Sequence, residues 1–479
     1  MGTLRQICCA LALGALAPLG WAGQVTVLGI NDMHASIDNM PKLATLVKQE
    51  RARDPQALLF SAGDNRTGNP FNDMYPKPSW PMVALMNRIG FNLSTLGNHS
   101  FDAGMDAMRE LIMGAEFRVV CANVSAADKD RILLQPYRIF ERNGVKVGVL
   151  GLLQLGPNGI PDILPEQGEG FTFRDPFAVA QEYRWLRDQC DVLIFLTHLG
   201  FEDDVELARQ CPWVDAIIGG HTHTKVDGAH MEGNVMVTQA GCRCGYLTRL
   251  VFDVQEGRVA AKEAKLLPVA DCAADPEAQE MVDQFKDDPY LQEQIAVNAA
   301  DITEREGVGC LFADAQREKA GCDIAVANFG SIRVDTLPAG PLRMSDVFRI
   351  DPFGNDMVLF RLTGEELADL ITNISLIDHH GMPSVSGMGY TAKLDRNNKA
   401  SLVEMHHEDG SPIDPAKTYT VVTSSFVASS TQFKHADPGR SLKVKCCDAF
   451  ADFLKKRGTV DYSTVRRAKV IREVPRDHH

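Results

Sequence analysis

Short apolar runs alternate with amphipathic segments through the first half of the chain. The segments 40–50 and 81–89 each carry their apolar residues on one helical face. The apolar runs are predicted strands: 24–30, 57–61, 92–96, 145–152, 191–197 and 214–218. This alternation predicts an α/β (α+β) domain over residues 23–268, in which helices cover a layered sheet.

The pattern changes after residue 268. Residues 273–288 are polar and charged, with Met281, Val282 and Phe285 at helical spacing and no apolar strand run. We expect a helical linker over 269–300 and a second, smaller α/β domain over 301–479. Its predicted elements are a helix near 311–319 and strands at 323–327, 357–362 and 418–423. Two domains also fit the length, because 479 residues exceed what one hydrophobic core usually supports.

Five of the predicted strands end in residue types that bind metal ions. The endings are Asn31-Asp32-Met33-His34, Gly63-Asp64, Gly97-Asn98-His99, His198 and Gly219-Gly220-His221-Thr222-His223. The carboxyl ends of strands in an α/β sheet meet at one crevice, so these endings can converge. A single Asp or Asn beside glycine is usually turn chemistry, and a lone histidine is usually a surface or core residue. Five such endings in order favour a shared site for two metal ions.

The spacing within these endings supports a common site. Asp32 and His34 are two residues apart, as are His221 and His223, so each pair shares one face of an extended chain. Asp64 has two carboxylate oxygens with which to bridge two ions. The candidate ligands are Asp32, His34, Asp64, Asn98, His198, His221 and His223. Mixed Asp, Asn and His ligands suit two divalent transition-metal ions, Zn, Mn, Fe, Co or Ni, and water between two such ions would ionise near neutral pH.

His99 and Asp102 form a second candidate pair. They are three residues apart on one side of a helical turn, so Asp102 can accept a proton from His99 and orient its ring. Such a histidine could stabilise charge on a phosphate oxygen or protonate a leaving alkoxide. The alternative is that Asp102 only caps a helix.

The net charge and the N-terminal segment limit which classes of partner and which cellular compartment we expect. A formal net charge of −14 argues against a nucleic-acid polymer or an anionic membrane as partner. Residues 1–22 resemble an export signal, with Arg5 before an apolar run and small residues near Ala22, and no later segment predicts stable membrane insertion. We therefore expect an exported protein, periplasmic or secreted. Ten of its twelve cysteines follow the signal, and we expect structural disulfides and a few buried thiols.

The strand endings and the segment Gly97-Asn98-His99-Ser100-Phe101-Asp102 resemble the 5'-nucleotidase family, which has a calcineurin-like metallophosphoesterase domain. The resemblance implies a four-layer α/β/β/α sandwich and a C-terminal 5'-nucleotidase domain that binds substrate. It also implies that Asp64 bridges the ions and that His99 and Asp102 act as a catalytic dyad. One ion would take Asp32, His34, Asp64 and His223, and the other Asp64, Asn98, His198 and His221.

The second half resembles the family's nucleotide-binding domain. The stretch from Asn328 to Arg333 is similar to the segment whose arginine binds the substrate phosphate or carboxylate. Phe353 and Phe426 lie in stretches similar to the two that stack on the base, although core packing is the alternative from the residues alone. By this resemblance the two domains rotate about the linker.

The resulting hypothesis is an exported dimetal phosphohydrolase acting on nucleoside 5'-monophosphates or related small-molecule nucleotides. Altered second-domain loops, such as residues 429–433, leave alternatives open. One is a related hydrolase for UDP-sugars, 2',3'-cyclic nucleotides or a thiosulfonate. Another is a nucleotide-binding receptor without catalysis. The sequence makes no prediction of the oligomeric state.

Overall fold

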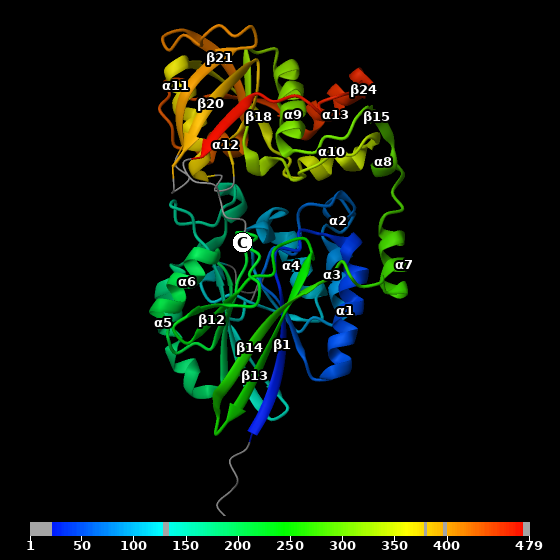
Figure 1. Cartoon of the computed structure of the whole chain (residues 1–479), viewed down its shortest axis with the longest axis vertical. Coiled ribbons are helices and arrows are strands. Elements are labelled where there is room, and N and C mark those ends of the chain that lie inside the picture. Colours follow the sequence, from blue (N-terminus) through cyan, green and yellow to red (C-terminus); the bar gives the residue numbers. More distant parts are fainter. Residues whose placement is uncertain (1–21, 128–133, 378–380, 396–399, 473–479) are drawn as a thin grey trace, which may run out of the picture.

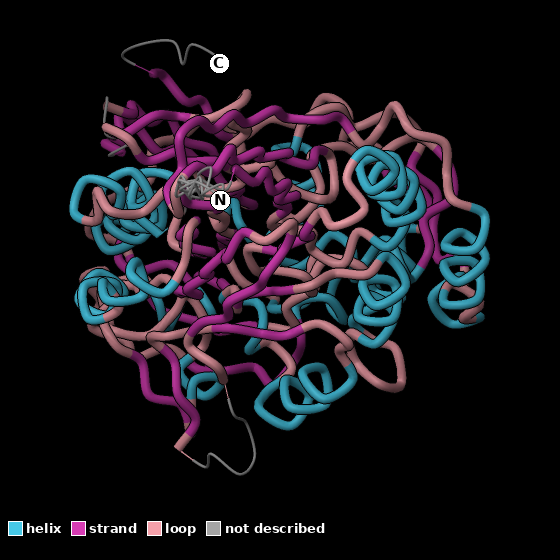
Figure 2. The backbone as a smooth tube through the Cα atoms, turned by 90° about the horizontal axis from the view of Figure 1, so that it is seen from below, coloured by secondary structure: helices cyan, strands magenta, loops and turns pink. Residues whose placement is uncertain are grey.

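The computed structural model describes residues 22–127, 134–377, 381–395 and 400–472, arranged as two domains (Figure 1). The predicted export signal therefore lies outside the described residues, apart from Ala22. In Figure 1 the N-terminal domain is the lower half, and the C-terminal domain is the upper half. Figure 2 shows strands in the interior with helices along the sides.

Two six-stranded sheets form the N-terminal domain. The first has the order β14 (Arg258–Pro268), β13 (Tyr246–Gln255), β1 (Ala22–Ile30), β2 (Leu58–Ser61), β3 (Leu93–Thr95) and β4 (Arg118–Val120). The second has the order β11 (His230–Glu232), β12 (Val235–Thr238), β10 (Ala216–Ile218), β9 (Val192–His198), β7 (Val145–Leu153) and β6 (Tyr137–Arg142). A separate two-stranded ribbon pairs β5 (Val124–Ala126) with β8 (Phe171–Phe173).

Burial on both sides of each sheet explains the continuous apolar runs. Along β1, Val25 and Val27 pack into the core between the two sheets, whereas Leu28 and Ile30 pack against the helices outside. The helices outside the first sheet are α1 (Met40–Arg53), α3 (Trp80–Ile89) and α7 (Pro276–Phe285). Those outside the second are α5 (Pro176–Glu182) and α6 (Phe201–Gln210). The predicted α/β/β/α sandwich is therefore confirmed.

All five strands with metal-binding endings are present, and they are divided between the two sheets of the sandwich. Strands β1, β2 and β3 are mutually parallel neighbours in the first sheet. Strands β9 and β10 are parallel neighbours in the second. Their carboxyl ends meet on the side of the domain that faces the C-terminal domain (Figure 1).

A mixed five-stranded sheet is the centre of the C-terminal domain. Its order is β19 (Ser384–Ser386), β16 (Ile324–Ala327), β22 (Thr418–Ser424), β18 (Asp356–Thr363) and β23 (Arg440–Lys445). One face packs against α9 (Arg305–Ala320), α10 (Met344–Ile350) and α13 (Cys446–Arg457). The other face packs against α11 (Gly364–Ile377) and against a small sheet of β21 (Ala400–His407), β20 (Met388–Leu394) and β25 (Ala468–Arg472).

The predicted linker is helical at its start and a strand at its end. Helix α7 contacts α1 and α3 of the N-terminal domain, and α8 (Pro289–Gln292) contacts α10 of the C-terminal domain. Residues Gln294–Asn298 form β15, which pairs with β17 (Gly340–Arg343) and β24 (Thr459–Val460). The last residues of the range 269–300 thus belong structurally to the C-terminal domain.

Two expectations about the chain as a whole can be compared with the structure. Among the described residues, no helix has both the length and the apolar character needed to cross a bilayer. The ten cysteines after the signal are all described, and all ten are free thiols. The expected disulfides are therefore wrong for this structure, in which most of these cysteines are buried in the cores as small apolar residues.

Candidate active site

The first pair of candidate ligands lies in a loop and not on a strand. Asp32 and His34 follow the end of β1 with left-handed backbone angles, φ 49° and 45°. His221 and His223, after β10, also have positive φ, and so does Asp64, after β2. The strand-face argument for these pairs is therefore wrong, although the side chains do converge. Non-glycine residues held in this region are concentrated at functional sites, where the surrounding structure maintains them.

Asp32 and Asp64 are surrounded by histidines. The carboxylate of Asp32 lies 3.5 Å from His223 Nε2 and 3.9 Å from His198 Nε2. Asp64 Oδ2 lies 3.2 Å from His198 Nε2 and 4.0 Å from His34 Nε2. His34 Nε2 and His223 Nε2 are 2.9 Å apart. Five of the seven predicted ligands, from both sheets, therefore form one cluster.

Asn98 and His221 extend this cluster along one side. The amide oxygen of Asn98 is 3.2 Å from His221 Nδ1, and the rings of His221 and His198 are 5.3 Å apart between centroids. The backbone N–H of His221 donates to Asp32 Oδ2 at 2.9 Å. All seven predicted ligands are thus brought to one site.

The histidine hydrogen bonds fit a metal centre. His198 Nδ1 is 2.7 Å from the carbonyl oxygen of Ala62, which fixes the proton on Nδ1, while Nε2 is buried without a hydrogen-bond partner. His34 Nδ1 likewise lies 3.1 Å from the carbonyl oxygen of Thr67. An imidazole whose other nitrogen donates to the backbone is the usual state of a metal ligand. The donor set of carboxylate, amide oxygen and imidazole fits divalent transition metals.

Charges in the cluster act in opposite directions on two of its histidines. Burial, helped by Arg333 and His223, holds the pKa of His34 well below its ordinary value, so its imidazole is neutral, the form that binds metals. Burial opposes charge on His198 as well, but Asp64 and Asp32 outweigh it and raise the pKa of His198 to about 9. A divalent cation would compete for the same carboxylates.

Glycines bring the loops close enough to form the cluster. A Cβ at Gly97 would lie 2.0 Å from Asp64 Oδ1, and one at Gly63 would lie 2.8 Å from His198 Nδ1. Gly63 also has φ +92°, which other residues rarely adopt. These two glycines therefore set the packing of the β2 and β3 endings.

The His99–Asp102 pair forms as the spacing predicts. Both belong to the turn around the 3₁₀ helix Asn98–Phe101, and His99 Nδ1 lies 2.8 Å from Asp102 Oδ2. Burial opposes charge on His99, but the carboxylates of Asp102 and Asp64 raise its pKa above the ordinary value. His99 Nε2 faces the cluster, 3.9 Å from Asp64 Oδ2.

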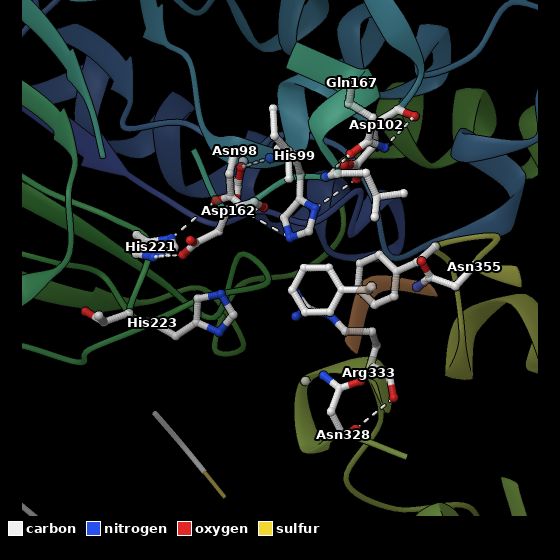
Figure 3. A pocket seen from close by; sticks show the side chains of 18 residues that line it. Asn98, His99, Asp102, Asp162, Gln167, His221, His223, Asn328, Arg333 and Asn355 are labelled. Carbon is white, nitrogen blue, oxygen red and sulfur yellow. Dashed lines mark hydrogen bonds and ion pairs between the residues drawn. The ribbon is translucent and has the colours of Figure 1, made fainter. Parts of the chain in front are cut away.

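The C-terminal domain supplies the opposite wall of the site. Arg333 Nη2 lies 3.1 Å from His34 Nε2, and the ring of Phe353 stacks on His99 with centroids 5.7 Å apart. A cavity of about 190 Å³ lies between the domains. The predicted substrate residues Asn328, Arg333, Phe353 and Phe426 all line it (Figure 3).

Three residues that sequence reasoning missed also support the site. The Thr67 hydroxyl donates to Asp102 Oδ2 at 2.6 Å, and Gln167 Nε2 donates to the backbone oxygen of Asp102 at 3.3 Å. Asp162 places a carboxylate oxygen 3.4 Å from His221 Nε2 (Figure 3). Gln167 and Asp162 belong to the stretch between β7 and β8, where no strand ending marks them. Thr67 is three residues after Asp64, so its closeness in sequence to a candidate ligand is a signal that could have identified it.

Both halves of the chain match known families. Residues 25–225 match calcineurin-like phosphoesterases, and residues 286–436 match the C-terminal domain of 5'-nucleotidases. Protein UshA of Escherichia coli is 26% identical, with 85% of each chain covered. The trifunctional nucleotide phosphoesterase protein YfkN of Bacillus subtilis is 28% identical over 91% of this chain, which spans 34% of that protein's length.

A solved structure agrees with these matches. The crystal structure of a 5'-nucleotidase precursor from Thermus thermophilus has a TM-score of 0.80 and 26% identity, and covers 94% of this chain and 100% of that one. The fold and the matched domains together define a metal-dependent phosphoester hydrolase. The chain belongs to the 5'-nucleotidase family, with a calcineurin-like phosphoesterase domain followed by a 5'-nucleotidase C-terminal domain.

Proposed function

We propose that this protein is an exported dimetal phosphohydrolase that removes phosphate from nucleoside 5'-monophosphates or related nucleotides. The observation that carries this proposal is one cavity whose two walls have different chemistry. One wall holds the Asp and His cluster, and the other holds a guanidinium and an aromatic ring, Arg333 and Phe353. Metal ligands opposite a cation and a ring fit a ligand that joins a phosphate to a flat base.

The seven predicted ligands would hold two divalent transition-metal ions. Asp32, His34, Asp64 and His223 would take one, and Asp64, Asn98, His198 and His221 the other, with Asp64 shared. Bound there, the ions would supply Lewis acidity and an activated water. Asn31 orients Asp32, because its Nδ2 donates to Asp32 Oδ2 at 2.6 Å and to the carbonyl oxygen of Gly241 at 2.6 Å.

His99 would act on the phosphate during hydrolysis. The carboxylates of Asp102 and Asp64 raise the pKa of His99, which favours the protonated ring that would stabilise charge on a phosphate oxygen or donate to the leaving oxygen. Asp102 fixes the ring through Nδ1, which directs Nε2 to the cluster. Arg333 would neutralise a further phosphate oxygen by charge-assisted hydrogen bonds.

The base would bind between aromatic side chains of the C-terminal domain. Phe353 and Phe426 both line the cavity, and stacking gains dispersion energy without requiring a particular base. Phe353 rests on His99 here, so a bound base would have to replace that contact or lie on the other face of the ring.

The proposal can be tested by phosphate release from chelated protein replenished with Mn or Zn. We expect metal-dependent release from AMP or another nucleotide in a panel with UDP-glucose, 2',3'-cyclic nucleotides, a thiosulfonate and p-nitrophenyl phosphate. Arg333→Met should raise KM about tenfold or more through the lost charge-assisted bonds. His99→Ala should lower kcat by about 10² or more, the usual range for a general acid.

The matched control is Arg349→Met, because Arg349 is ion-paired to Asp346 on α10 and does not line the cavity. It should leave KM unchanged. Tight nucleotide binding without metal-dependent hydrolysis of any ester would contradict the proposal and favour the receptor alternative. Faster turnover of UDP-glucose, a cyclic nucleotide or a thiosulfonate would reassign the substrate.

A further inference from the structure

A buried arginine next to the site has no charge partner among the described residues. Arg66 is two residues after Asp64 and is only 6% exposed. Its Nε and Nη1 atoms are buried and make no hydrogen bond, and no carboxylate in the described part of the chain pairs with it. An unpaired charge in the interior costs several kcal/mol, so such a cation normally has a counter-ion.

Arg66 lines a second cavity, separate from the one between the domains. This cavity has a volume of about 60 Å³ and lies between α3 and α4 (Gly104–Gly114). Most of its wall is apolar, formed by side chains such as Met82, Met86 and Met108. A single water needs about 10–15 Å³ of such volume, so the space admits a small ion together with water.

Two serine hydroxyls at this cavity can donate to a further acceptor. Ser79 is 1% exposed, and its hydroxyl oxygen has no hydrogen-bond partner. Ser79 is also the residue before α3, whose positive dipole end lies at the cavity wall. The hydroxyl of Ser100 accepts from Gly97 N at 3.1 Å and keeps its own proton for another acceptor.

The carboxylate of Asp73, in the loop after Asp64, already accepts hydrogen bonds from the backbone. Both carboxylate oxygens of Asp73 accept backbone N–H groups, from Thr67 at 3.1 Å, Gly68 at 2.7 Å and Asn69 at 3.0 Å. Asp73 therefore organises the loop after Asp64 and is not paired with Arg66. Apolar walls and donor groups around an unpaired cation select a ligand that is small, negative and only an acceptor.

We propose that this cavity binds one small inorganic anion of about the size of chloride, with Arg66 as its counter-charge and Ser79 as a further donor. The anion supports the catalytic loops from behind. Arg66 belongs to the loop that carries Asp64, and Ser100 follows His99 directly, so an occupant of the cavity contacts both loops. This site is separate from substrate binding and does not depend on the proposed nucleotide specificity.

Thermal unfolding of the metal-loaded, full-length protein tests the proposal. Sodium chloride or bromide should raise Tm by about 3 °C relative to sodium gluconate at equal ionic strength, because a ligand of the folded state stabilises it. Arg66→Met should abolish this shift and be at least as stable as wild type in gluconate, since it removes an unpaired buried charge. Ser79→Ala should weaken the halide dependence about fivefold in apparent affinity.

The control is Arg88→Met, an arginine on α3 that is paired with Glu277 at the surface. It should retain the full halide shift. Crystals grown in bromide should show anomalous scattering within hydrogen-bond distance of Arg66 Nε or Nη1. Water alone at that place, no halide shift in wild type, or an equal shift in Arg66→Met would overturn the proposal.

Discussion

Thr67 shows how much a single side chain contributes to this site. Its carbonyl oxygen accepts from His34 Nδ1, and its hydroxyl donates to Asp102 Oδ2, so one residue orients a candidate ligand and the proposed His99–Asp102 dyad. Its φ of 69° is left-handed, which a β-branched residue adopts only when its surroundings enforce it.

Thr67→Val tests the hydroxyl alone, because the backbone carbonyl remains. Losing one hydrogen bond of about 1 kcal/mol to Asp102 should lower kcat about fivefold to tenfold, with metal content unchanged. Thr372→Val is the control, since the Thr372 hydroxyl donates to the backbone oxygen of Ala368 within α11, in the C-terminal domain. Steady-state kinetics with metal analysis would decide, and an unchanged kcat would refute the role.

A second prediction at this scale concerns Asp351, which is buried at the end of α10 with Oδ2 unpartnered. Burial raises the pKa of Asp351 to about 7, against about 3.9 in an unfolded chain. Between these values the folded chain keeps a proton that the unfolded chain has released. The free energy of unfolding therefore falls as pH rises from about 4 to about 7, by at most about 4 kcal/mol.

Asp351→Asn should remove this pH dependence. Denaturant unfolding from pH 5 to pH 8 should show the variant gaining stability relative to wild type as pH rises. Asp356→Asn is the control, because Lys445 and burial act in opposite directions there and the net effect holds the pKa of Asp356 below its usual value. A pH-independent difference for Asp351→Asn would contradict the assignment.

At the scale of the element, strands position the site and loops form it. His198 is the last residue of β9, and the other six candidate ligands lie two to five residues past a strand end. Five of the seven have left-handed backbone angles, which bend the chain back across the strand ends: Asp32, His34, Asp64, His221 and His223. Close approach of the β2 and β3 endings depends on Gly97, which faces Asp64.

Gly97→Ala should weaken metal affinity tenfold or more while the protein remains folded, because the new methyl group would displace the Asp64 carboxylate. Gly233→Ala is the control: nothing lies within 4 Å of its Cβ position, and its φ of +57° makes alanine at least as strained in the backbone as at Gly97, where φ is −115°. Metal titration followed by calorimetry, beside circular dichroism of both variants, would measure the difference. Equal affinity in the two variants would show that Asp64 tolerates the methyl group.

At the scale of the whole molecule, the site joins elements distant in the sequence. Asp32 and His223 come from different sheets, and Arg333 comes from another domain. Ions bound at such a place should stabilise the N-terminal domain, because they bind the folded state and not the separated segments.

Chelation should therefore lower the Tm of the N-terminal domain by about 5–10 °C, and Mn or Zn should restore it. Differential scanning calorimetry can follow both domains. Asp64→Ala should unfold at the same temperature with and without chelator. A wild-type Tm that is the same with and without chelator would argue against bound metals.

Much of this molecule could be predicted from the sequence. The strands that carry the candidate ligands and the helices 40–50 and 81–89 followed from apolar periodicity, because both faces of these strands are buried, whereas the sandwich followed from the family resemblance. The candidate ligands followed from residue types at strand endings, and the His99–Asp102 pair followed from its three-residue spacing. Spacing failed for Asp32 and His34, where the backbone is left-handed and strand alternation does not apply.

The sequence by itself determined which residues are candidates for the chemistry, because strand endings and local spacing are properties of short segments. Only the tertiary structure decided that two sheets share the site, that Arg333 and Phe353 close it, and that Asp162, Gln167 and Arg66 surround it. Those contacts join residues up to about 300 positions apart, for example His34 and Arg333. They depend on the packing of whole domains, which no local pattern encodes.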